Sequence, residues 1–101
     1  MDISQLQIET SETGRPFLFI TEVTTWEAFP TQARALVKAL GGAVLLPIST
    51  ADARLWLVMI SWRPYTLAFE DQPWGMTLEP FFGFGTSRLS VLLSRIRAIY
   101  S

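Results

Sequence analysis

Neither cysteine nor histidine occurs in the 101-residue sequence. The absence of cysteine excludes disulfides and thiolate chemistry. With histidine missing as well, a zinc site is not expected, because zinc sites in proteins almost always use one of these two residues. The commonest general base of enzymes is also missing. We therefore predict that the protein is not an enzyme, and we expect no catalytic residue, no metal site and no cofactor.

Charge is scarce as well. Charged residues make up 17% of the chain and the net charge is -1, whereas about a quarter of the residues are charged in an ordinary protein. A chain without a basic surplus is not expected to bind nucleic acid. The sequence has no apolar run of the ~20 residues that a bilayer span requires, and its amino terminus lacks the pattern of a signal peptide. We expect a cytoplasmic protein with no nucleic-acid partner and no membrane attachment.

Apolar residues, in contrast, are abundant, at 50% of the chain. A chain of this length is expected to form one domain, residues 1–101, which can bury a core without disulfides. Residues 3–9 alternate in polarity, and residues 17–23 are rich in aromatic and β-branched side chains. These two patterns predict two strands that pair as a hairpin.

The segment TTWEAFPTQARALVKALGG, residues 24–42, predicts the first helix. Its apolar residues recur on one face with the helical period, and Thr24 and Glu27 have the spacing of a capping box. Pro30 lies inside this pattern, where it either kinks the helix or delays its regular start. The two glycines at the end of the segment predict the end of the helix, because glycine accepts the left-handed cap conformation.

Four later stretches predict strands, and a second apolar stripe predicts a helix that starts near Thr86. The predicted strands are residues 43–48, 54–62, 65–70 and 74–79. The whole pattern predicts an α+β fold of order ββαββββα. We expect two layers, in which a mostly antiparallel sheet of five or six strands carries both helices on one face.

The stretch RLWLVMISW, residues 54–62, is apolar at successive positions, so its side chains would be apolar on both faces of the sheet. Two helices on one side leave the other face uncovered, and exposed apolar patches mark sites of association. We therefore predict an interaction module that forms a homodimer through the open face or an edge of the sheet. Another protein partner is the alternative occupant of this surface.

The tryptophans allow two interpretations. Trp56 and Trp62 have the same parity in the predicted strand, so they would share one face, and Trp74 begins a neighbouring strand. One hypothesis is an aromatic interaction surface on the sheet. Its residues would be Arg54, Trp56, Trp62 and Trp74. The alternative is that each tryptophan packs in the core.

The stretch PFFGFGTSRLS, residues 80–90, raises a second functional hypothesis, a small-ligand or anion-binding protein. Backbone N–H groups at a helix start bind anions, and an anion would offset the unfavourable arginine in the first turn. The residues of this hypothetical site are Gly83, Gly85, Thr86, Ser87 and Arg88. A ligand site between the sheet and the helices is a further alternative. A simple capped helix start also explains the stretch, because the Rossmann and Walker patterns are not met.

The segment 24–42, together with the tryptophan-rich strand after it, resembles a small proteobacterial family of single-domain proteins with no assigned function. The resemblance extends over nearly the whole chain. It implies a cytoplasmic bacterial protein, and it supplies no catalytic residues.

Overall fold

The structure is a computed structural model that describes residues 1–71, 74–82 and 86–100; the side chains of Asp71, Trp74 and Thr86 are outside this description. Within these residues, six strands and two helices follow one another in the order ββαββββα. The strands are β1 (Gln7–Thr10), β2 (Pro16–Thr21), β3 (Ala43–Ser49), β4 (Arg54–Ile60), β5 (Arg63–Asp71) and β6 (Trp74–Pro80), and the helices are α1 (Phe29–Ala39) and α2 (Thr86–Tyr100).

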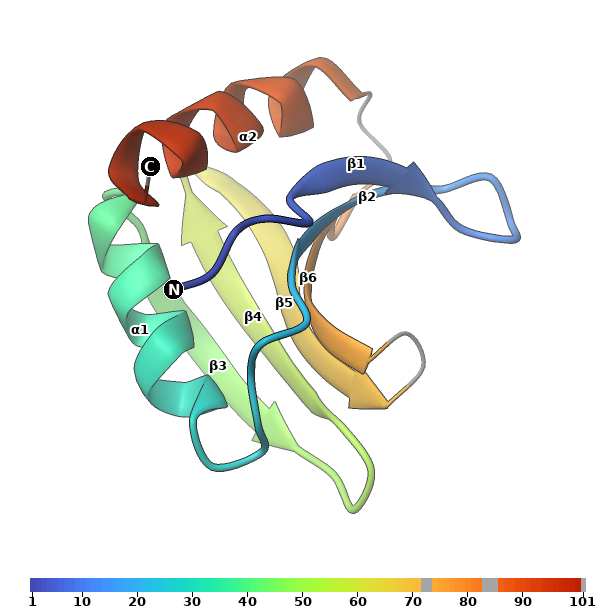
Figure 1. Cartoon of the computed structure of the whole chain (residues 1–101), viewed down its shortest axis with the longest axis vertical. Coiled ribbons are helices and arrows are strands. Elements are labelled where there is room, and N and C mark those ends of the chain that lie inside the picture. The colour runs from blue at the N-terminus through green and yellow to red at the C-terminus, as the bar shows by residue number, and fades with distance from the viewer. Residues whose placement is uncertain (72–73, 83–85, 101) are drawn as a thin grey trace.

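The six strands form one sheet in the order β1-β2-β6-β5-β4-β3, and every neighbouring pair is antiparallel. Strands β3 to β6 form an antiparallel meander, and the β1–β2 hairpin joins it at β6. Helix α1 packs along β3 and α2 along β1 and β2. Both helices lie on one side of the sheet (Figure 1). The predicted two-layer α+β fold is therefore confirmed.

The core lies between the sheet and the helices. Helix α1 buries Phe29, Ala33, Leu36 and Val37, which confirms the apolar face expected from the helical period. The strands supply the other side of the core at alternate positions. Full burial of a valine, leucine or phenylalanine side chain contributes about 1.5–3 kcal/mol to stability. The apolar periodicity of the sequence therefore accounts for the helix-facing side of the sheet.

The start of α1 differs from the prediction. The helix begins at Phe29, its N-cap is Ala28, and no side chain caps it. Pro30 lies in the first turn, where its missing N–H is not needed because those N–H groups have no partner within the helix. The Thr24 hydroxyl donates to the Gln32 side-chain oxygen instead. The expected capping box at Thr24 and Glu27 was wrong, and the delayed start at Pro30 is confirmed.

Strand β4 is shorter than the predicted strand 54–62, because it ends at Ile60 and residues 61–62 form the turn to β5. Strand β3 lies at the edge of the sheet. Its register shifts between Val44 and Leu46, and Pro47 offers no backbone donor. A shift and a proline both hinder the addition of another strand to this edge.

Candidate functional site

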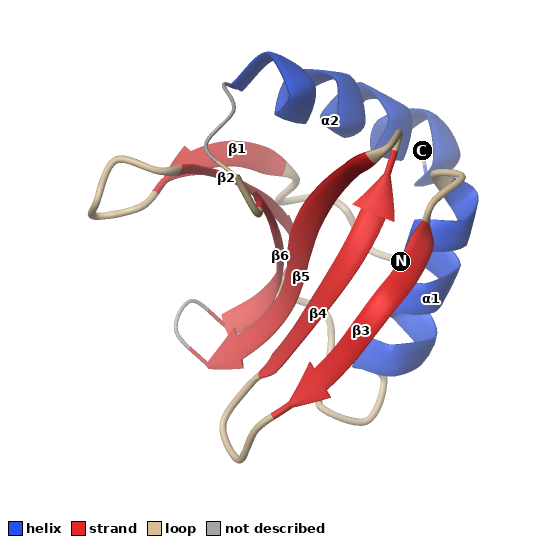
Figure 2. Cartoon of the chain, turned by 180° about the vertical axis from the view of Figure 1, so that it is seen from behind, coloured by secondary structure: helices blue, strands red, loops and turns tan. Residues whose placement is uncertain are grey.

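The sheet face opposite the helices is apolar over β3 and β4. Figure 2 shows β3 and β4 from the side opposite α1. Residues that pair across antiparallel strands point to the same face. Three apolar pairs point to this open face: Ala43 with Met59, Leu46 with Leu57, and Ile48 with Leu55. Leu46 and Ile48 are 50% and 43% exposed, and the three partners from β4 are half-buried.

Trp62 continues this apolar surface at the β4–β5 turn. Its side chain is 93% exposed, and together with Ala43 and Met59 it lines a hollow of about 240 Å³. Ser61 and Trp62 have positive φ angles of 52° and 63°. Two-residue hairpin turns of this kind favour Asn and Gly, because other residues pay a steric cost. We call the three apolar pairs together with Trp62 the apolar strip.

A second hollow, of about 190 Å³, lies on the open face over β5 and β6. Its lining combines small residues, two apolar walls and two carboxylates. The lining residues are Ser11, Phe17, Leu55, Thr66, Ala68, Glu70, Thr77 and Glu79. The β1–β2 hairpin extends away from α1, and so do the end of β5 and the start of β6 (Figure 1). We call this feature the sheet hollow.

The structure does not bring the four residues of the expected tryptophan surface together. Trp56 is 3% exposed and lies on the helix side, where the Phe29 ring meets it edge-on at 5.3 Å. Arg54 also lies on that side, 4.1 Å from the centre of the Trp26 ring. Trp62 is on the turn, because β4 ends at Ile60 and the parity of the strand is lost. The side chain of Trp74 is outside the described residues.

The indole nitrogen of Trp56 is buried and has no hydrogen-bond partner in the described part of the chain. The guanidinium of Arg34 lies 4.9 Å from the centre of the Trp56 ring, which is the geometry of a cation–π contact. These contacts place Trp56 in the core. The role of the four residues in an interaction stays a prediction.

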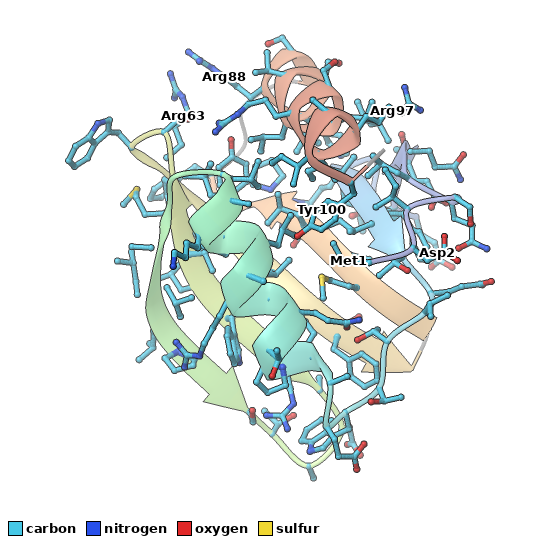
Figure 3. All side chains as sticks on the ribbon, turned by 60° about the vertical axis from the view of Figure 1, so that its left-hand side comes forward. Met1, Asp2, Arg63, Arg88, Arg97 and Tyr100 are labelled. Atoms are coloured by element: carbon cyan, nitrogen blue, oxygen red, sulfur yellow. The ribbon has the colours of Figure 1, made fainter. Side chains whose placement is uncertain are left out.

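The expected anion site falls largely outside the described residues, since these exclude Gly83, Gly85 and the side chain of Thr86. Ser87 and Arg88 are exposed at the start of α2. Figure 3 shows Arg63 at the same end of the molecule as Arg88. Burial raises the pKa of the Tyr65 hydroxyl above its usual value, and the positive charges of both arginines offset part of this rise. Anion binding stays a prediction.

Within the described residues, neither helix is long and apolar enough to cross a bilayer, and no three metal-ligating side chains come together. No protein-family model, no curated protein and no solved structure matches the chain. The resemblance to the proteobacterial family therefore stays a prediction.

Proposed function

We propose that this protein is a non-enzymatic interaction module of the bacterial cytoplasm, and that two copies associate through their apolar strips. One observation carries the proposal. Both helices cover the same face of the sheet, while the opposite face exposes a continuous apolar surface that ends at Trp62, whose side chain is 93% exposed.

The chemistry of the strip favours a second copy of the chain as its occupant. No member of the strip is charged, so two strips can meet about a two-fold axis without burying an unpaired charge. A standard interface buries about 800 Å² on each partner, and the whole chain exposes 5721 Å². Two sheets that pack face to face lie about 10 Å apart.

The edge of β3 is less suited to association than the face. Strand addition requires a regular row of backbone donors and acceptors. The register shift near Leu46 and the missing donor of Pro47 interrupt that row. We therefore propose contact through side chains of the open face.

Trp62 is the proposed anchor of the dimer. Tryptophan is enriched among the few residues that carry most of the energy of an interface. A non-glycine residue in the left-handed region costs about 1–2 kcal/mol, and strained backbone of this kind clusters at functional sites. An exposed tryptophan in such a conformation contributes little to the stability of the single chain. We therefore expect Trp62 to contribute mainly to the free energy of association.

The variant Trp62→Gly tests the proposal, because folding and association should change in opposite directions. Glycine accepts φ of 63° without steric cost, so the isolated chain should gain about 1 kcal/mol. Loss of the anchor should raise the dimer dissociation constant about thirtyfold, which corresponds to a hot spot of about 2 kcal/mol. Sedimentation equilibrium measures the dissociation constant, and urea denaturation measures stability.

The matched control is Val91→Ser, because Val91 on α2 is also exposed, at 56%, but is not part of the strip. This variant should leave the dissociation constant unchanged. The proposal is overturned if the unmodified protein sediments as a monomer at high concentration, or if both variants weaken the dimer equally.

A further inference from the structure

The sheet hollow differs from the apolar strip in its charge. Glu70 and Glu79 line it, and both are half-buried. In the described part of the chain, neither carboxylate has a hydrogen-bond or ion-pair partner. Among the described residues that line the hollow, none is basic. Because burial without a partner is unfavourable for a charged group, the hollow favours a cation from solution.

The two carboxylates stand at opposite ends of the hollow. Glu79 lies opposite Thr66 and Glu70 lies opposite Gly75 in the β5–β6 ladder. The interval from Gly75 to Glu79 is four residues of one strand. At about 3.4 Å per residue, this interval separates the two positions by about 14 Å along the strands.

The middle of the hollow is suited to an aliphatic chain. Ala68 and Thr77 face each other across β5 and β6 and leave room above the sheet, while Phe17 and Leu55 supply apolar walls. The volume of about 190 Å³ is below the ~300 Å³ of ordinary small-molecule pockets. A slender chain therefore fits this space better than a ring system.

We propose that the sheet hollow binds a linear aliphatic polyamine, with one terminal ammonium group at Glu70 and the other at Glu79. The methylene groups lie against Phe17 and Leu55, where each buried methylene is favourable. A secondary ammonium in the middle of the polyamine donates a hydrogen bond to the Thr77 hydroxyl oxygen, because a hydroxyl oxygen has two acceptor lone pairs.

This proposal does not depend on the homodimer. The apolar strip lies over β3, β4 and the turn after β4, and it shares only Leu55 with the lining of the hollow. The variant Trp62→Gly, which should weaken the dimer, should therefore bind the polyamine as the unmodified protein does. Failure of one proposal is thus separable from failure of the other.

Isothermal titration calorimetry with spermidine tests the site. The unmodified protein should bind spermidine, and the shorter diamine putrescine should bind at least about threefold more weakly, because it reaches one carboxylate at a time. The variants Glu70→Gln and Glu79→Gln should each lower the affinity for spermidine about threefold to tenfold. The variant Ala68→Leu, which fills the hollow without a change of charge, should lower it as well.

Glu27→Gln is the matched control. Glu27 is exposed near the start of α1, and its substitution changes the net charge by the same amount as the two hollow variants. It should leave spermidine binding unchanged. A thermal melt of each variant reports whether the fold is retained. The proposal is overturned if the unmodified protein does not bind spermidine, if putrescine binds equally well, or if Glu27→Gln weakens binding as much as the two hollow variants.

Discussion

At the scale of single residues, the glycine pair after α1 shows how closely the helix end approaches the sheet. A Cβ atom on Gly42 would lie 2.3 Å from the Met59 carbonyl oxygen and 3.2 Å from Val37 Cγ1. Gly41 has open space around it and a φ of 71°. One glycine is therefore needed for space, and the other for a left-handed backbone that ends the helix.

Gly42→Ala should destabilise the protein by about 2–3 kcal/mol, because the clash involves a backbone oxygen and overpacking costs of this order are typical. Gly41→Asn is the control, since asparagine tolerates the left-handed region. We expect it to cost less than about 1 kcal/mol, although asparagine is larger than alanine. Urea denaturation measures both values, and a greater loss for Gly41→Asn than for Gly42→Ala contradicts the assignment of the two roles.

The sequence predicted that these glycines end the helix. It did not predict that the missing side chain of Gly42 also allows β4 to pack close to the end of α1. Spacing along the chain shows where a backbone turns, whereas the approach of Met59 depends on the packing of distant segments. The same limit explains Trp62. Because Trp62 and Trp56 have the same parity, the sequence predicted that they share one face of a strand. In the structure, β4 ends at Ile60, and Trp62 therefore lies in the turn.

At the scale of secondary-structure elements, one arginine connects α2 to both α1 and the β4–β5 turn. Arg95 donates from Nη2 to the Leu40 carbonyl oxygen at 2.7 Å. It also donates from Nη1 to the Ser61 hydroxyl oxygen at 3.4 Å. Leu40 is the C-cap of α1, where a positive charge is favourable because the carbonyl groups point outward. Arg95 therefore supports the turn that presents Trp62.

Arg95→Ala should lower the free energy of unfolding by about 1–2 kcal/mol, because a charge-assisted bond to a helix-end carbonyl is lost. Arg97→Ala is the matched control on the same helix. Arg97 is exposed, and it has no hydrogen-bond or ion-pair partner in the described part of the chain. Its removal should cost less than about 0.5 kcal/mol. Equal losses in urea denaturation contradict the proposed link between the elements.

At the scale of the whole molecule, the sheet has one covered face and one open face. Periodicity was sufficient to predict the order of elements and the helices on one side, because apolar spacing reports which face of each element is buried. The apolar pattern of residues 54–62 also predicted an open apolar face on this strand, but not which residues of β3 complete the apolar strip, and not the sheet hollow. Both depend on the register of the strands, which places Leu46 beside Leu57 and Ala68 beside Thr77. The spacing of apolar residues within one segment does not determine the register between two strands.

A homodimer through the open face makes stability depend on protein concentration. For a folded dimer that unfolds to two chains, each tenfold increase in concentration should add about 1.4 kcal/mol to the apparent free energy of unfolding. Leu46→Asp places a charge within the strip and should abolish this dependence, because two carboxylates would be buried together at the interface. Val91→Asp makes the same change in net charge on an exposed position of α2 and should preserve the dependence. Urea denaturation at several protein concentrations measures the effect. A midpoint that is independent of concentration in the unmodified protein would mean that the open face meets water or a different partner, and that the strip does not join two copies.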